Sequence, residues 1–230
     1  MKQNVYEYAY ELKREKQHRN SRIFIIIVSI VLFLSLFFSL ILFPVLVRSD
    51  SMETDISKNG TVFVTPLSRT PQRGDIIFLG RSDNYNPSVF MKIVNTITGF
   101  FTAQQYHFGD NKKISGKPCV RRVLALPGDS IYMKDYVLYI KPKNENNYLT
   151  EFEIVKKPYS VKIYSVPAEW DGIGSISSFT EKTLNENEYF VLADNRIESS
   201  DSRIWGAVNS KQIKGKVIMQ YFPFTKIHFF

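Results

Sequence analysis

The sequence predicts a mainly β extracytoplasmic domain held by one N-terminal transmembrane helix. Residues 23–47 form an apolar run without a single charge, and a helix needs about 20 such residues to cross the hydrocarbon core of a bilayer. After this run, short segments rich in Val, Ile, Tyr and Phe alternate with turn residues, a pattern typical of strands. A chain of 230 residues is long enough for one packed domain plus such an anchor.

The charges beside the apolar run set its expected orientation. Five basic residues stand shortly before the run: Lys13, Arg14, Lys16, Arg19 and Arg22. Because cytoplasmic flanks carry the excess of Lys and Arg, we expect residues 1–22 as a cytoplasmic basic tail, 23–47 as the transmembrane anchor and 48–230 as the extracytoplasmic domain. No small-residue cleavage site follows the run, so it is expected to be retained. Pro44 fits a helix that frays where it leaves the lipid.

Six segments are expected to supply the strands of the outer domain. They are residues 61–66, 74–80, 119–126, 130–142, 189–193 and 215–222. Within the fourth segment, the residues Met133 to Val137 are expected to form a hairpin corner. Residues 143–180 show no pattern to which a role can be assigned.

One insert, residues 85–108, breaks the strand pattern. Its apolar residues recur at helical spacing between Asn86-Pro87 and Gly99. Two interpretations stay open at this point. The helix either contacts the bilayer interface together with the aromatic C-terminus, or it docks on the core of its own domain.

Composition and charge exclude some partners. The formal net charge is +8, and residues 1–22 contribute six Lys/Arg against three Glu. No basic patch interleaved with aromatic residues is present, so a nucleic-acid partner is not expected; a basic domain beside anionic membrane lipid is the simpler interpretation. The single cysteine, Cys119, cannot form an internal disulfide. No His/Cys/carboxylate cluster has ligand spacing, so no metal or other cofactor is expected.

Four motifs follow one another along the chain. They are "RSDSMETDI" (48–56), "RGDIIFL" (73–79), "RRVLALPGD" (121–129) and "YFVLADNRIESSDSRIWG" (189–206). Each alone is an ordinary loop, turn or surface ion pair. Together, in this order and behind an anchor, they resemble the conserved boxes of the type I signal peptidases (leader peptidases). The resemblance covers nearly the whole outer domain, apart from the helical insert and the 143–180 tract, and it implies the β-rich fold of that family.

The resemblance also implies roles for the matched residues. Ser51 would attack the peptide carbonyl, and its N–H, together with the Ser49 hydroxyl, would form the oxyanion hole. The family activates its serine with a lysine that burial keeps neutral, and Ser199 would orient that base. Four residues are implied as an ionic scaffold beneath the site: Arg122, Asp194, Asp201 and Arg203.

Position 121 departs from the family pattern. Arg121 stands where the family has its catalytic lysine, and a guanidinium stays protonated in proteins. Arg121 therefore should not act as a general base, and loss of such a base costs about a hundred- to ten-thousand-fold in rate. His107 and Lys117 are the substitutes considered for this role, whereas His18 is expected in the cytoplasm and His228 lies near the C-terminus.

Other positions also depart from the family boxes. Thr54 and Asp55 replace the usual Pro-Thr, and Ala193 replaces a glycine. We hypothesise that the added carboxylate of Asp55 pairs with Arg121 and fills the site with an ion pair.

Two functions remain open from the sequence. The first is that of a signal peptidase I, a serine endopeptidase of the bacterial cytoplasmic (inner) membrane that removes N-terminal signal peptides from secretory preproteins, with family preference for small residues at the first and third positions before the cut. The second is that of a catalytically impaired relative that binds preproteins or an active peptidase. A self-cleaving repressor with a related β fold is disfavoured, because the anchor takes the place of a DNA-binding domain.

Overall fold

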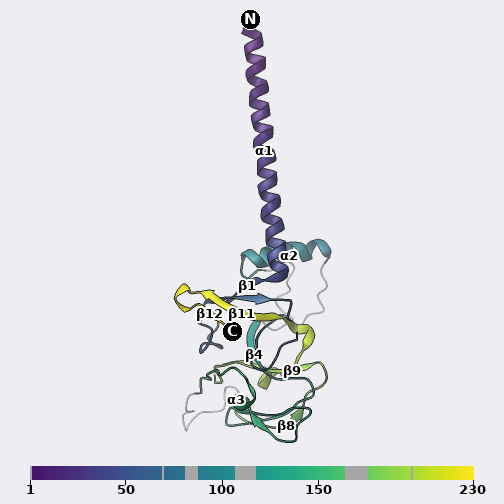
Figure 1. The fold of residues 1–230 in the computed structure, drawn as a ribbon, viewed down its shortest axis with the longest axis vertical. Coiled ribbons are helices and arrows are strands. Elements are labelled where there is room, and N and C mark those ends of the chain that lie inside the picture. The colour runs from purple at the N-terminus through teal and green to yellow at the C-terminus, as the bar shows by residue number, and fades with distance from the viewer. Residues whose placement is uncertain (1, 69, 81–87, 107–117, 164–175, 198) are drawn as a thin grey trace.

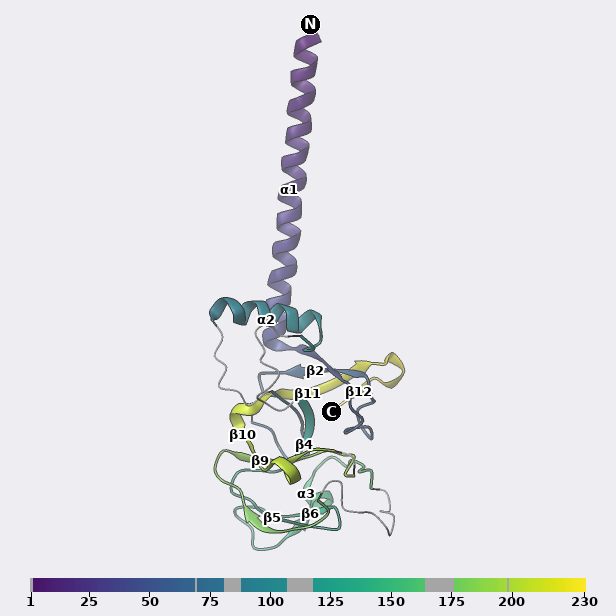
Figure 2. The same ribbon diagram turned by 180° about the vertical axis from the view of Figure 1, so that it is seen from behind.

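The computed structural model describes residues 2–68, 70–80, 88–106, 118–163, 176–197 and 199–230. In this part of the chain, one long helix stands on a domain built from two antiparallel sheets (Figures 1 and 2). The mainly β fold expected from the sequence is confirmed.

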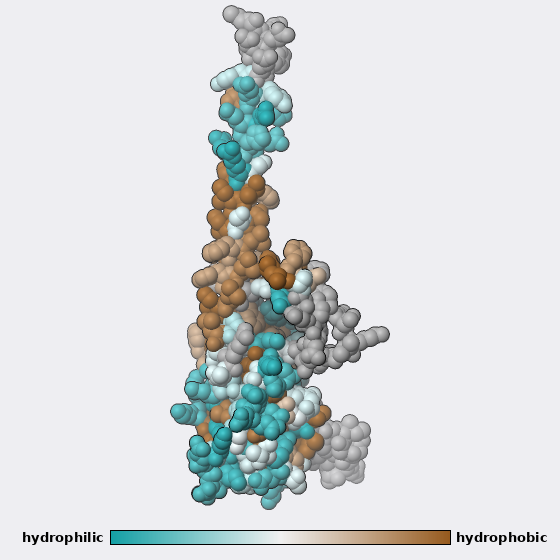
Figure 3. Space-filling model, turned by 90° about the vertical axis from the view of Figure 1, so that its right-hand side faces the viewer, coloured by the Kyte–Doolittle hydropathy of each residue, from teal (hydrophilic) through white to brown (hydrophobic). Residues whose placement is uncertain are grey.

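The helix α1 (Lys2–Ile41) projects away from the domain. One described helix is long and apolar enough to cross a membrane by length and composition, with its candidate span at Tyr10–Leu34, and none of the most apolar window of that span is buried against the protein. Figure 3 shows hydrophobic residues gathered along the half of α1 that is nearer the domain. A helix with this surface needs an apolar environment that the domain does not supply.

The apolar run is divided between two elements, so the expected boundary of the anchor at residue 47 is wrong. The helix ends at Ile41 and strand β1 (Phe43–Val47) follows it. Pro44 cannot continue a helix, and its missing N–H is tolerated because β1 is an edge strand of its sheet. The side chains of Phe43, Val45 and Val47 are buried in the domain, so this end of the apolar run belongs to the domain core.

The first sheet has eight strands in the order β1-β2-β11-β3-β4-β9-β10, with β12 paired to β11. All its neighbouring strands are antiparallel. The remaining bounds are β2 (Gly60–Thr65), β3 (Ile76–Leu79), β4 (Cys119–Ala125), β9 (Glu188–Leu192), β10 (Val208–Asn209), β11 (Ile213–Phe222) and β12 (His228–Phe229).

The second sheet has four strands in the order β7-β6-β5-β8. Its members are β5 (Ser130–Lys134), β6 (Val137–Lys141), β7 (Leu149–Thr150) and β8 (Phe179–Thr183). The expected hairpin corner is confirmed: β5 and β6 are joined by Asp135 and Tyr136, which both have positive φ. Two positive φ values in a two-residue loop match the twist of the flanking strands.

Short helical elements complete the domain. They are α3 (Glu151–Ile154), α4 (Ser202–Trp205) and the 3₁₀ turns η1 (Ser210–Gln212) and η2 (Phe224–Lys226). The expected strand segments all appear as strands, whereas β1, β7, β8, β10 and β12 were not expected.

Helix α2 (Val89–Phe101) confirms the helical interpretation of the insert. It lies across the base of α1 and contacts it (Figures 1 and 2). Only Gly99 of this helix is buried, whereas Val89 and Phe90 are each 74% exposed. No residue of α2 belongs to the buried apolar clusters of the described chain, so the structure gives no support for docking on the core, and contact with the bilayer interface stays a proposal.

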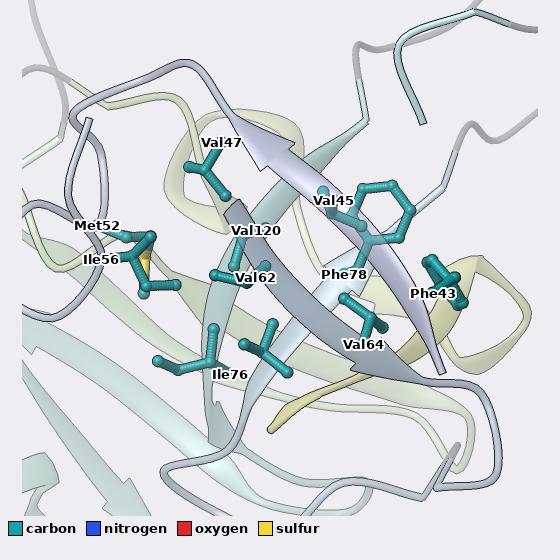
Figure 4. Packing of buried hydrophobic residues seen from close by; sticks show 11 residues of the cluster. Phe43, Val45, Val47, Met52, Ile56, Val62, Val64, Ile76, Phe78 and Val120 are labelled. Atoms are coloured by element: carbon teal, nitrogen blue, oxygen red, sulfur yellow. The ribbon is translucent and has the colours of Figure 1, made fainter. Parts of the chain in front are cut away.

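One cluster of buried apolar side chains lies directly behind the site. Its members come from β1, β2, β3, β4, β11 and the turn after β1 (Figure 4). Met52 and Ile56 belong to that turn and are fully buried. Burying two such side chains contributes about 1.5–3 kcal/mol each, which fixes the turn that carries Ser51.

Candidate active site

The turn after β1 holds Ser51 against the first sheet. The carbonyl of Met52 accepts hydrogen bonds from the N–H groups of Asp55 and Ile56, at 3.1 and 2.6 Å. The carbonyl of Ser51 accepts one from the Asn195 N–H at 2.9 Å, just beyond β9. Ser51 is 4% exposed. Packing and backbone hydrogen bonds therefore set the position of its hydroxyl.

Arg121 reaches the Ser51 hydroxyl from strand β4. Its Nη1 donates to Ser51 Oγ at 2.9 Å and to the Val120 carbonyl at 2.6 Å. Its Nε and Nη2 donate to the Ser200 carbonyl at 3.1 and 2.7 Å. The structure thus brings together Ser51 and Arg121, which lie 70 positions apart in the chain.

The hydrogen bonds at Ser51 run in a direction that does not activate a nucleophile. Ser49 Oγ lies 2.8 Å from Ser51 Oγ, and either hydroxyl can be the donor. Arg121 has only N–H donors and no acceptor, so Ser51 Oγ accepts from it. Among the described residues, no basic acceptor takes the Ser51 proton. The guanidinium can instead stabilise negative charge on that oxygen.

Ser199 directly precedes Ser200, but its hydroxyl makes no hydrogen bond to any residue that the structure describes. Its Oγ is buried without a partner, and the residue is 6% exposed. The expectation that Ser199 orients the side chain at position 121 is not met by any hydrogen bond in the described part of the chain. The guanidinium of Arg121 donates to the carbonyl of the neighbouring residue Ser200, and not to the Ser199 hydroxyl.

The four residues expected as an ionic scaffold form two separate buried pairs. Arg122 Nη2 lies 2.7 Å from Asp194 Oδ2, and Arg203 Nη2 lies 2.7 Å from Asp201 Oδ2. Burial opposes the charge of Arg122, but its hydrogen bond to Asp194 and the two nearby carboxylates outweigh this effect and raise the pKa of the guanidinium.

The position of the Asp55 carboxylate contradicts the hypothesis that Asp55 pairs with Arg121. Asp55 Oδ2 lies 2.6 Å from Arg122 Nη2, so Asp55 pairs with Arg122 and not with Arg121. Successive side chains of a strand point to opposite faces, and Asp55 lies on the Arg122 side of β4. The proposed Asp55–Arg121 ion pair is therefore wrong.

The structure describes two of the other candidates for a base, His18 and His228, and neither forms a hydrogen bond to Ser51. His107 and Lys117 lie outside the described residues. Arg14 of α1 donates to His18 at 3.4 Å, and the ring of His228 packs edge-on against Phe230.

Sequence reasoning missed several residues beside the site. Lys162 Nζ lies 3.0 Å from Glu53 Oε2, next to the nucleophile turn. The ring of Tyr159 lies 4.3 Å below the Arg122 guanidinium, and its hydroxyl bonds to Glu151. These residues belong to the 143–180 tract, where no motif or periodicity marked them.

The fold and the site together define a class. A mainly β domain that presents a buried serine to a basic side chain has the arrangement of serine peptidases that replace the Ser-His-Asp triad by a serine and one basic residue. The family model described as "Signal peptidase, peptidase S26" matches residues 20–222. The chain belongs to this family.

Individual relatives agree with this assignment. Signal peptidase I of Bacillus caldolyticus is 37% identical over 123 residues, which is 53% of this chain and 62% of the relative. Signal peptidase I U of Bacillus subtilis (strain 168) is 34% identical over 127 residues, with the same two shares. Signal peptidase IB of Staphylococcus aureus (strain MRSA252) is 28% identical over 114 residues, or 48% of this chain and 56% of the relative. The chain spans about three-fifths of these curated relatives.

Solved structures of known proteins are also similar to this chain. The crystal structure of a signal peptidase I from Enterococcus faecalis V583 is 24% identical, with 64% of this chain and 96% of that chain covered. The TM-score of 0.29 is too low for a detailed comparison of the two folds.

Proposed function

We propose that the chain is a membrane-anchored serine endopeptidase of the signal peptidase I type, which cuts N-terminal signal peptides from secretory preproteins. One observation carries this proposal: Ser51 Oγ lies 2.9 Å from the side chain at position 121, on a turn fixed by the core. The membership of the family supports the same conclusion.

The proposed reaction starts with attack of Ser51 Oγ on the peptide carbonyl. The Ser51 N–H and the Ser49 hydroxyl stabilise the oxyanion, and Ser49 Oγ is already 2.8 Å from Ser51 Oγ. The Ser51 proton must leave to water, because Arg121 has no lone pair to accept it. The peptide C–N bond then breaks: the mature protein leaves as an amine that takes its proton from water, and the signal peptide stays bound to Ser51 Oγ as an ester. A water molecule hydrolyses this ester, which returns a proton to Ser51 Oγ and releases the signal peptide with a free carboxylate. We expect slow cleavage, since general-base help is worth about 10²–10⁴ in rate.

The test is a cleavage assay on a model preprotein with the full chain in detergent micelles. We expect slow cleavage by the wild type and none by Ser51→Ala. For Arg121→Lys, we expect about 10²–10⁴-fold faster cleavage, because a buried lysine can lose its proton and take that of Ser51. Cleavage that persists in Ser51→Ala would contradict the role of this serine.

A second candidate function has an observation of its own in its favour. Arg121 donates to Ser51 and leaves the hydroxyl without a base, which suits a protein that binds preproteins, or an active peptidase, without cutting. A wild type that is inert, with cleavage only after Arg121→Lys, would favour this second function over the first.

The proposed location is the bacterial cytoplasmic membrane, with residues 1–22 in the cytoplasm and the β domain outside. The basic side chains before the apolar run support this orientation. Membrane lipid is also the proposed partner of α2, because its exposed apolar side chains stand beside the base of α1 (Figure 3). Helix α2 would then lie in the plane of the interface.

A further inference from the structure

Arg121 is a buried cation without a carboxylate partner. Its residue is 6% exposed, and its hydrogen bonds go to uncharged oxygens, namely two carbonyls and the Ser51 hydroxyl. Among the residues that the structure describes, no carboxylate lies within ion-pair distance of Arg121. A buried charge is tolerated when an opposite charge compensates it.

The other buried arginines show how this chain treats such a charge. Arg122, Arg196 and Arg203 are each at most 6% exposed. Each lies 2.6 to 2.7 Å from at least one carboxylate oxygen. Arg121 is therefore the exception among four equally buried guanidinium groups. A bound anion would supply the opposite charge that the described part of the chain does not give Arg121.

The site also has N–H groups that make no hydrogen bond to described residues and could bind an anion. A guanidinium has five N–H groups, and the hydrogen bonds of Arg121 to described residues use one at Nε, two at Nη1 and one at Nη2. One N–H of Nη2 is left. The Ser51 N–H donates no hydrogen bond to any described residue. Ser49 is an exposed residue, and its Oγ lies 2.8 Å from Ser51 Oγ, so the group borders the protein surface.

We propose that Ser51, Ser49 and Arg121 bind the C-terminal carboxylate of a peptide, and that this carboxylate belongs to the signal peptide released by cleavage. The choice of peptide rests on the proposed function, in which the carbonyl attacked by Ser51 becomes that carboxylate. One oxygen would take the N–H of Ser51 and the other the guanidinium, as charge-assisted hydrogen bonds. A site with a neutral lysine has no fixed charge to hold this product.

The experiment measures binding in a variant that cannot cut. The full chain carrying Ser51→Ala, in detergent micelles, is titrated with a short fluorescent peptide ending in Ala-Gln-Ala, either as free acid or as C-terminal amide. We expect the acid to bind at least about tenfold more tightly than the amide, because a charge-assisted hydrogen bond is about twice as strong as a neutral one. Equal affinity for acid and amide would overturn the proposal.

Two further variants show where the preference arises. Adding Arg121→Gln should abolish the preference, so that acid and amide bind with equal affinity, and the remaining amide binding also shows that the variant is folded. Adding Lys58→Gln, which removes an exposed positive charge on the same turn, should leave the preference intact. A preference for the acid that survives Arg121→Gln would overturn the proposal. If this variant no longer binds the amide, the comparison of acid and amide binding to Ser51→Ala decides whether the proposal holds.

Competition with sodium acetate separates a peptide carboxylate from a small anion. We expect acetate to compete at least about a hundredfold more weakly than the peptide acid, because it lacks the peptide contacts. Equal competition would assign the site to small anions and overturn the peptide assignment. These titrations do not depend on cleavage. If the wild type cuts preprotein but Ser51→Ala binds acid and amide with equal affinity, this inference is refuted and the proposed function is still supported.

Discussion

At position 121, the length and shape of the side chain decide the chemistry of the site. The guanidinium binds the carbonyl of Ser200, the residue after Ser199, through two nitrogens. Ser199 Oγ is left buried without a partner. Buried polar groups are nearly always hydrogen-bonded, so an orphaned hydroxyl next to a replaced residue indicates a site built for a different side chain.

The substitution Ser199→Ala tests this interpretation. In the wild type we expect a change in the free energy of unfolding between about zero and a gain of about 1 kcal/mol, since a buried hydroxyl without a partner costs free energy. In the Arg121→Lys background, the same substitution should reduce the gained cleavage, because the lysine then loses its hydrogen-bond partner. Urea unfolding and the preprotein assay measure the two effects.

Ser202→Ala is the matched control for that experiment. Ser202 Oγ is buried and accepts a hydrogen bond from the Val191 N–H at 3.1 Å. Its removal should cost about 1–3 kcal/mol, because a backbone donor loses its partner. A loss of similar size in Ser199→Ala would contradict the absence of a partner for Ser199.

Part of the site could be predicted from the resemblance of the motifs to those of the type I signal peptidases. The order of the motifs paired Ser51 with Arg121, and the structure brings these residues together. The Ser200 carbonyl could not be predicted, because every residue has one and no residue type marks it. The partner of Asp55 could not be predicted either, since the alternation along β4 decides which of two adjacent arginines faces it.

At the scale of elements, strand β1 could not be predicted, because its residues belong to the same apolar run as the membrane helix. A continuous apolar stretch predicts a membrane helix when its length is the only criterion. The pairing of Pro44 with Phe63 and of Val45 with Val62 ends the helix early. That pairing depends on β2, a later segment of the chain, and so no local pattern reveals it. Strand β8 was missed for the opposite reason, because its sequence, Phe179–Thr183, is mostly polar and exposed.

Helix α2 gives a prediction about lipid contact. In a Cys119→Ser background, Phe90→Cys carries a fluorescent label and the chain is reconstituted into vesicles with nitroxide-labelled lipid. Phe90 is 74% exposed on a helix that contacts α1, so we expect strong quenching of the label, as for an interfacial helix.

Two other positions serve as controls in the same vesicles. A label at Lys211→Cys, on the exposed turn η1, should not be quenched. A label at Lys13→Cys should react with membrane-impermeant maleimide only from the side opposite to Lys211→Cys, as the basic flank predicts. An unquenched label at position 90 would remove lipid from the proposed partners of α2, and reaction of both positions from one side would contradict the orientation.

At the scale of the whole molecule, a buried ion pair joins the second sheet to the loop after β9. Glu151 of α3 and Arg196 are both fully buried, and Arg196 Nη2 lies 2.6 Å from Glu151 Oε2. Glu151 also accepts from the Leu138 N–H of β6 at 3.1 Å, and Arg196 donates to the Tyr136 carbonyl at 3.2 Å. The loop that carries Asp194 and Asn195 beside the active site is therefore tied to the hairpin of the other sheet.

This pair gives a prediction about the stability of the domain. Glu151→Gln keeps an oxygen for the Leu138 N–H but removes the charge opposite Arg196, and breaking a buried pair on one side costs about 3–5 kcal/mol. We expect the urea midpoint to fall accordingly, with cleavage falling too because the loop that holds Ser51 through Asn195 loosens. Glu181→Gln, which breaks the exposed pair with Lys141 at 3.7 Å, should change stability by less than about 1 kcal/mol. Equal effects of the two substitutions would show that the buried pair does not hold the sheets together.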